Sequence, residues 1–104
     1  MNQVTIEQIK PAHFLISGEL DIHTVPQAEQ QMAVLLDQLS AGELCIDLKA
    51  VSRCDSAGLA LLVAWLGTAK RRQLSLVYRH LPEQLLQIAK VTEVDGLLPL
   101  SNSP

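Results

Sequence analysis

The feature of this sequence that most constrains its fold is a run of ten residues without a polar side chain, residues 57–66. A membrane-spanning helix needs about 20 apolar residues, so this run is too short to cross a bilayer. A helix on one face of a sheet needs an apolar stripe only somewhat wider than about 100°, whereas this run is apolar on all sides. The run therefore predicts a helix that is covered by a sheet and by a second surface.

Helical spacing divides the run into two opposite faces. The face that we assign to the sheet consists of Leu59, Leu62, Val63 and Leu66. The opposite face carries Gly58, Leu61 and Trp65, which we expect to project outward. An exposed Trp and Leu beside a glycine form a patch typical of protein interfaces. The alternative is that a third helix covers this face and that Trp65 belongs to the core.

Periodicity along the rest of the chain predicts an α/β fold with the element order ββαβαβαβ and a mixed β-sheet. We expect strands at residues 4–9, 14–20, 44–48, 74–78 and 97–100, with a polar loop at 49–54. Helices are expected between the second and third, third and fourth, and fourth and fifth strands. Because each of these crossovers spans a helix, the last four strands should be parallel. Residues 1–100 form a single domain in this interpretation, and residues 101–104 a disordered tail.

Two of the predicted helices begin with residues that can cap them. Thr24, followed by Gln27, matches a capping box, and Pro26 is acceptable in a first helical turn. Asp55 and Ser56 open the apolar helix, and both side chains can accept hydrogen bonds from its first N–H groups. Capping alone would explain both residues. The alternative is that the Ser56 hydroxyl also contacts a partner protein or carries a phosphate.

Composition and motifs argue against several classes of function. The formal net charge of −3 disfavours nucleic-acid binding. His13, His23 and His80 belong to no catalytic or metal-binding motif, and the five glycines are scattered singly, so we expect neither an enzyme nor an ATP-binding loop. Cys45 and Cys54 lack the spacing of a redox pair or a zinc site. We therefore expect no metal and no cofactor.

The first residues of the chain contain no positively charged segment followed by an apolar stretch. This pattern lacks the features of a secretory signal peptide. We expect a cytoplasmic protein without direct membrane insertion.

The segment around the start of the apolar helix resembles the signature of the STAS domain, which sulfate-transporter tails and anti-sigma factor antagonists share. The resemblance rests on Ile46-Asp47-Leu48, Val51 and residues 55–62. More narrowly, further segments are similar to MlaB-type STAS subunits of phospholipid-transport ABC systems in Gram-negative bacteria. These segments are Gly18-Glu19-Leu20, Thr24-Val25-Pro26, Trp65-Leu66, Leu81-Pro82-Glu83-Gln84-Leu85, Ile88-Ala89, Gly96 and Leu97-Leu98-Pro99.

This resemblance implies a STAS fold and a non-catalytic cytoplasmic subunit, peripheral to the inner membrane through its partner. The implied partner is the ATPase of an Mla-type ABC transporter, and through it the membrane permease. Such a subunit supports transporter assembly and activity and thus outer-membrane lipid asymmetry. The expected partner-binding residues are His23, Thr24, Asp55, Ser56, Ala57, Gly58, Leu61 and Trp65.

The same resemblance leaves a second function open. Ser56 aligns with the residue that is phosphorylated in anti-sigma factor antagonists, and it retains a hydroxyl group. The alternative to a transporter subunit is therefore an anti-sigma factor antagonist that acts as a phosphorylation-controlled switch. An outward apolar patch would favour a lasting complex over a transient one.

Overall fold

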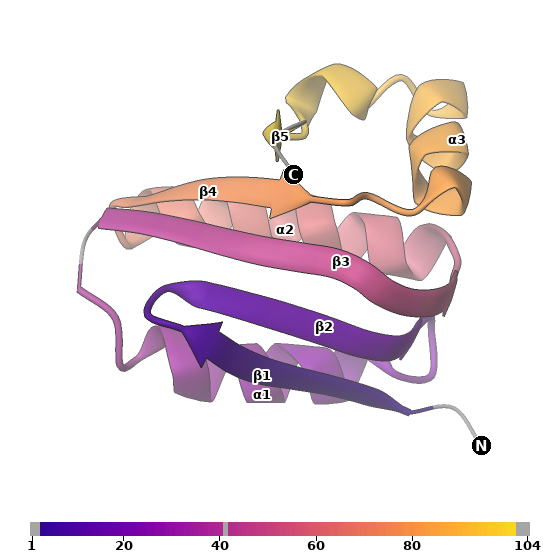
Figure 1. The fold of residues 1–104 in the computed structure, drawn as a ribbon. Helices are drawn as coiled ribbons and strands as arrows, with labels where there is room; N and C mark the ends of the chain where they lie inside the picture. Colours follow the sequence, from indigo (N-terminus) through magenta and orange to yellow (C-terminus); the bar gives the residue numbers. More distant parts are fainter. Residues whose placement is uncertain (1–2, 41, 102–104) are drawn as a thin grey trace.

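The computed structural model describes residues 3–40 and 42–101 of the chain (Figure 1). Its elements follow the predicted order, with a short 3₁₀-helix added before the last strand. They are β1 (Val4–Lys10), β2 (His13–Leu20), α1 (Val25–Leu36), β3 (Gly42–Cys54), α2 (Ser56–Arg71), β4 (Leu74–Arg79), α3 (Glu83–Val91), η1 (Asp95–Leu97) and β5 (Leu100–Ser101).

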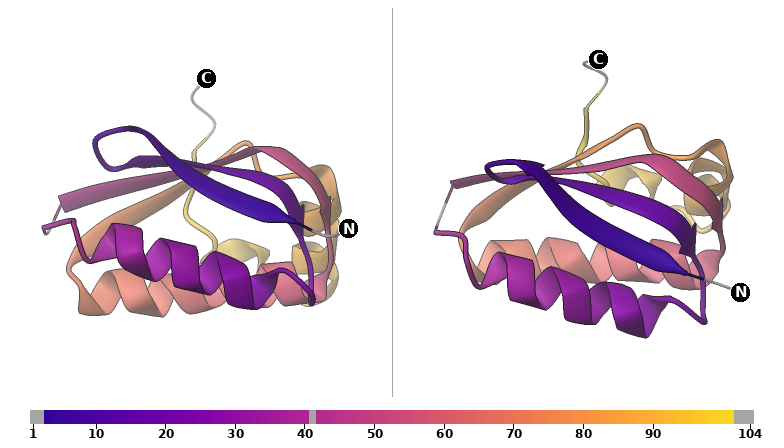
Figure 2. Two further views of the ribbon diagram at one scale, coloured as in Figure 1. Left: turned by 90° about the horizontal axis from the view of Figure 1, so that it is seen from below. Right: turned by 60° about the horizontal axis from the view of Figure 1, so that its bottom comes forward.

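The five strands form one mixed sheet in the order β1-β2-β3-β4-β5. Strand β1 pairs antiparallel with β2, and the other neighbours pair in parallel, as predicted. Right-handed crossovers that step in one direction across a sheet return their helices to the same face. Helices α1 and α2 accordingly lie side by side on one face (Figure 2). Over the middle of the opposite face, no helix of the described chain is present, and we call this the open face.

The core lies between the sheet and the two helices, and it is aliphatic apart from a few aromatic side chains. Tyr78 is fully buried, and its hydroxyl donates a hydrogen bond to the Leu62 carbonyl of α2 at 2.6 Å. Burial raises the pKa of Tyr78 well above its ordinary value. The buried residues of the sheet that face the helices are Val4, Ile6, Phe14, Ile16, Leu44, Ile46, Leu48, Leu74, Leu76 and Tyr78.

Strand β3 is longer than the sequence pattern predicts. The prediction ended the strand at Leu48 and placed a loop at 49–54, but β3 continues to Cys54. Its second half pairs with β2 through Ala50, Val51 and Arg53, after shifts in register. In these irregular pairs the backbone groups of β3 form hydrogen bonds with β2, whereas in a loop they would bond to water. The register shifts also interrupt the regular alternation of polar and apolar residues by which a strand is recognised in sequence. The predicted loop was therefore wrong.

The end of the chain also differs from the prediction. The 3₁₀-helix η1 occupies the start of the strand expected at 97–100, and the observed strand β5 is Leu100–Ser101. Ser101, which we assigned to the disordered tail, pairs with Arg79 of β4. Residues 102–104 of that tail lie outside the described residues.

The edge strand β1 is covered by a side chain of α1. The Gln31 carbonyl oxygen accepts a hydrogen bond from the Ile6 N–H at 2.7 Å, and its amide nitrogen donates to the Val4 carbonyl at 3.1 Å. The Gln31 amide thus bonds to β1 as the backbone of a neighbouring strand would. An unpaired edge is a template for strand addition, so we expect Gln31 to protect the sheet from self-association.

Replacing Gln31 with Ala should leave the Ile6 N–H and the Val4 carbonyl without their side-chain partners. We expect the free energy of unfolding to fall by about 1 kcal/mol and self-association to increase. Urea denaturation and sedimentation velocity measure the two effects. The control is Gln30→Ala, because Gln30 is exposed and its side chain has no hydrogen bond within the described structure. Equal behaviour of the two variants would show that Gln31 does not protect the edge.

Candidate protein-interaction site at the start of helix α2

The Asp55 carboxylate connects the start of α2 to the loop that follows β2. One oxygen, Oδ1, accepts hydrogen bonds from the N–H groups of Ala57 at 2.8 Å and Gly58 at 3.3 Å. The other, Oδ2, accepts one from the Ile22 N–H at 3.2 Å. Asp55 therefore caps the helix, as predicted, and also fixes the neighbouring loop beside it.

Gly58 allows α2 to approach the end of β2. A Cβ atom at this position would lie 2.5 Å from the carbonyl oxygen of Leu20, which is too close for a real contact. Gly58 is buried, so the expectation that it projects outward was wrong. Its role within the described chain is to permit close packing of helix and strand.

The Ser56 side chain is exposed, although it is the first residue of the helix. Within residues 3–40 and 42–101 its hydroxyl has no hydrogen-bond partner. Capping at this end of α2 is provided by Asp55. The interpretation that capping explains Ser56 was therefore wrong, and its hydroxyl is available to other molecules.

The loop between β2 and α1 is held by the side chains of Asp21 and Thr24. Asp21 Oδ1 accepts hydrogen bonds from the N–H groups of His23 at 2.9 Å and Thr24 at 3.1 Å. Desolvation alone would raise the pKa of Asp21, but these two hydrogen bonds lower the pKa below its ordinary value.

Thr24 does not make the predicted capping box. Its hydroxyl donates to the Glu19 carbonyl at 2.8 Å and accepts from the Asp21 N–H at 2.9 Å, so it bonds to the loop and makes no side-chain cap on α1. Thr24 is fully buried, which also corrects its assignment as a partner-binding residue. The neighbouring His23 is exposed, as a contact residue requires.

Ile22 is a surface residue that sequence reasoning missed. Its side chain is 67% exposed, while its backbone N–H is bonded to Asp55. Ala60 is also exposed and lies one helical turn after Ser56, on the same side of α2. The sequence signal that could have identified Ile22 is its position as an apolar residue between Asp21 and His23 in a polar loop. We call Ile22, His23, Ser56, Ala57 and Ala60 the α2-start surface.

Leu61 and Trp65 are buried, contrary to the expectation that they project outward. Their exposed fractions are 4% and 6%. Trp65 lines a small groove between the helices together with Met32 and Leu36, so α1 supplies the second surface that the apolar run requires. Within the apolar run, the exposed positions are instead occupied by small side chains, Ala60 and Ala64, which cost least when left in water.

The four residues of α2 that we assigned to the sheet-facing side are only partly buried as a group. Leu59 and Leu62 are buried, as expected, whereas Val63 and Leu66 are half-buried. Contact with both the sheet and α1 turns the larger side chains of α2 toward the core.

Trp65→Ala should remove a large core side chain and lower the free energy of unfolding by about 3–5 kcal/mol. Because Trp65 is the single tryptophan of the chain, circular dichroism is the suitable probe of unfolding. Val34→Ala is the control, since Val34 is 61% exposed and its truncation should change stability by less than about 0.5 kcal/mol. A Trp65→Ala variant as stable as this control would contradict the buried position.

Asp55 and Ser56 should differ in their effects on stability. Asp55→Ala removes the helix cap and the bond to the Ile22 N–H, and we expect a loss of about 1–2 kcal/mol. Ser56→Ala removes an exposed hydroxyl and should change stability by less than about 0.5 kcal/mol. Urea denaturation of both variants measures the difference. A comparable loss of unfolding free energy in Ser56→Ala would show that Ser56 also caps the helix.

The described residues include no group of three or more His, Cys, Asp or Glu side chains that could hold a metal ion. None of the helices in the same part of the chain has the length and hydropathy of a membrane-spanning segment.

Comparison with known proteins identifies the family. The family model described as "Mlab, STAS domain" matches residues 7–99. The anti-sigma-B factor antagonist of Listeria monocytogenes is 31% identical over 88 residues, which cover 84% of this chain and 75% of the relative. That of Bacillus subtilis is 30% identical over 86 residues, covering 83% and 77%. The chain therefore belongs to the STAS-domain family and has anti-sigma factor antagonists among its homologues.

Solved structures confirm the fold. The anti-sigma factor antagonist SpoIIAA in its unphosphorylated form superimposes with a TM-score of 0.70 at 15% identity, covering 96% of this chain and 89% of that one. An anti-sigma factor antagonist from Mycobacterium paratuberculosis gives a TM-score of 0.66 at 29% identity, covering 96% and 85%. The predicted STAS fold, a mixed sheet with helices in the order ββαβαβαβ, is thus correct.

Proposed function

We propose that this chain is a non-catalytic protein, acting as one STAS domain, that binds a partner protein through the α2-start surface under the control of Ser56. The observation that carries this proposal is the division of roles at the start of α2. Asp55 makes the hydrogen bonds that the fold needs, whereas the adjacent Ser56 hydroxyl is exposed. A residue that the fold does not require is free to serve recognition.

A phosphate on Ser56 would be chemically compatible with the folded domain. The positive end of the helix dipole stabilises negative charge at a helix N-terminus, and exposed His23 lies in the neighbouring loop. The same charge would be costly inside an interface that buries Ile22 and Ala60 against apolar groups. Modification would therefore act on binding more than on folding.

The first candidate partner is an anti-sigma factor, with this chain as its antagonist. The names of the curated relatives support this function directly, since they are anti-sigma-B factor antagonists of comparable length. The exposed Ser56 hydroxyl also suits a switch that is controlled by phosphorylation. In this function the kinase activity would belong to the partner.

The second candidate partner is the ATPase of an Mla-type phospholipid ABC transporter. The description of the matching family and the similarity to MlaB-type subunits support it. In that function the chain would be cytoplasmic, peripheral to the inner membrane through the ATPase and permease, and would support transporter assembly and outer-membrane lipid asymmetry. Leu61 and Trp65 form no outward patch that would favour this partner, because both residues are buried.

Ser56→Asp tests the proposed surface for either partner. Asp is a good residue at a helix N-terminus, so the melting temperature should be unchanged, whereas partner affinity should fall by at least about tenfold. Affinity is measured by retention on the immobilised ATPase and on the immobilised anti-sigma factor encoded in the same genome. Ser40→Asp is the matched control, because it adds the same charge at an exposed position. Ser40 follows the C-terminal end of α1, whereas the α2-start surface adjoins the loop before the N-terminal end of α1.

Purification of the chain from its native cells, with identification of what accompanies it, distinguishes the partners. An ABC ATPase would support the transporter subunit, and a kinase-like anti-sigma factor would support the switch. A folded Ser56→Asp variant that keeps the wild-type affinity for the identified partner would place Ser56 outside the interface and overturn the proposal.

A further inference from the structure

The open face of the sheet is hollowed above β3 in two adjoining places. The hollows measure about 250 and 200 Å³, and both are lined by His13, Cys45 and Arg79. They lie on the side of the sheet opposite α1 and α2, so they are separate from the helix-facing core. We call them together the open-face hollow, defined by Lys10, His13, Cys45, Lys49, Arg79 and His80.

Strand register brings these residues together from distant parts of the sequence. His13 of β2 is the neighbour of Cys45 in β3, and Asp47 of β3 is the neighbour of Arg79 in β4. Because alternate residues of a strand point to opposite faces, Cys45, Asp47 and Lys49 share the open face while Leu44, Ile46 and Leu48 enter the core.

Basic groups predominate in this hollow, although the chain as a whole has a net charge of −3. Three of the eight Lys and Arg residues and two of the three His residues line it. The acidic residues of the two hollows are Asp47 and Glu43. With Lys10, Lys49 and Arg79 against Asp47 and Glu43, the open-face hollow has a formal charge of +1 with its histidines neutral, on a protein whose net charge is −3.

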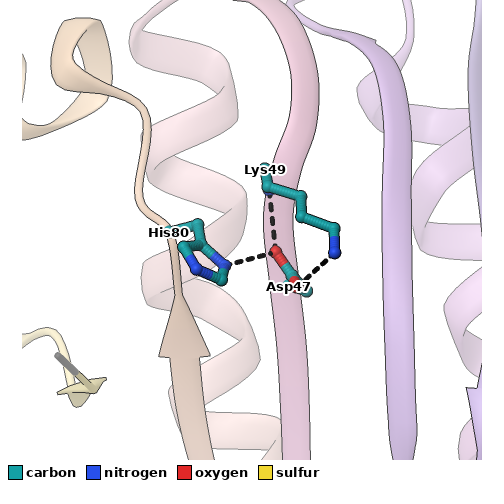
Figure 3. Close-up of polar contacts among 3 residues, drawn as sticks. All are labelled: Asp47, Lys49 and His80. Atoms are coloured by element: carbon teal, nitrogen blue, oxygen red, sulfur yellow. Dashed lines mark hydrogen bonds and ion pairs between the residues drawn. The ribbon is translucent and has the colours of Figure 1, made fainter. Parts of the chain in front are cut away.

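Asp47 is already engaged with its neighbours (Figure 3). Its Oδ1 accepts a hydrogen bond from the Lys49 N–H at 2.9 Å and lies 3.0 Å from His80 Nδ1, while Oδ2 lies 3.8 Å from Lys49 Nζ. The Asp47 side chain is only 11% exposed. Asp47 thus contacts both Lys49 and His80 at the rim, and its carboxylate is largely shielded from solvent.

We propose that the open-face hollow binds a small soluble molecule that carries a phosphate group. The hollow contains the guanidinium group of Arg79 and the ammonium groups of Lys10 and Lys49. Groups of these two kinds bind phosphate oxygens through charge-assisted hydrogen bonds. Each of the two adjoining hollows, at about 250 and 200 Å³, is smaller than the roughly 300–1,000 Å³ of typical pockets for larger ligands, so each suits inorganic phosphate or a short phosphate ester. Desolvation raises the pKa of the Cys45 thiol, which keeps the floor of the hollow uncharged.

This proposal does not depend on the proposed function, because the hollow and the α2-start surface share no residue. The test is a titration of the isotope-labelled protein with inorganic phosphate and with glycerol 3-phosphate, followed by the amide signals in a phosphate-free buffer. We expect saturable shifts for His13, Cys45 and Arg79, with a dissociation constant in the millimolar range or below. An absence of saturable shifts with both compounds would overturn the proposal.

Matched variants separate a specific site from general attraction of anions. The double variant Lys10→Gln/Lys49→Gln should bind about tenfold more weakly or worse. Lys70→Gln/Lys90→Gln removes the same charge from exposed positions on α2 and α3 and should bind like the wild type. Equal weakening in both double variants would show non-specific attraction and would overturn the site.

A further measurement distinguishes a soluble ligand from a lipid headgroup. Sedimentation with phosphatidylglycerol and phosphatidylcholine vesicles should show no binding that depends on Lys10 and Lys49. Binding to the anionic vesicles that the Lys10→Gln/Lys49→Gln change abolishes, without saturable binding of soluble phosphate, would assign the open-face hollow to a membrane surface instead.

Discussion

The arrangement of the candidate interaction site depends on one carboxylate. Asp55 accepts hydrogen bonds from the first turn of α2 and from the N–H of Ile22 in the loop after β2, so it joins two segments 33 residues apart in sequence. The close approach that these bonds require is possible because residue 58 is a glycine against the Leu20 carbonyl. Together they fix the start of the helix and leave the intervening Ser56 in solvent.

This arrangement explains how a sequence motif can combine a structural and a functional role. Asp55 and Gly58 make contacts within the fold, whereas Ser56 between them is exposed. In the proposed function, a change at Ser56 would therefore alter recognition without altering stability. The exposed neighbours of Ser56 in the α2-start surface include apolar Ile22 and Ala60 beside the polar His23. A phosphate on Ser56 would lose its hydrating water when a partner covers this surface. In the proposed function, the free-energy cost of that loss would allow phosphorylation to control binding.

The one-sided sheet gives this small protein two separate surfaces. Its crossovers step in a single direction, so both long helices cover the same face. The open face carries exposed polar side chains, among them Lys49 and His80. The α2-start surface lies at one end of the helical layer, whereas the open-face hollow lies across the strands. The two proposed binding surfaces therefore share no residue.

The sequence by itself determined the order of elements, the parallel crossovers and the capping role of Asp55, because these depend on local periodicity and on residues close in the chain. The STAS fold followed from the resemblance of residues 46–48, 51 and 55–62 to the family signature. Tertiary structure decided which side of α2 is buried. Helix α1 packs beside α2, so Leu61 and Trp65 turn inward and Ala60 and Ala64 remain outside. It also decided that Thr24 is buried and that β3 extends to Cys54, where irregular pairing with β2 replaces the alternation that marks a strand in sequence. The open-face hollow required the register of four strands, since its residues meet only when β1, β2, β3 and β4 are aligned.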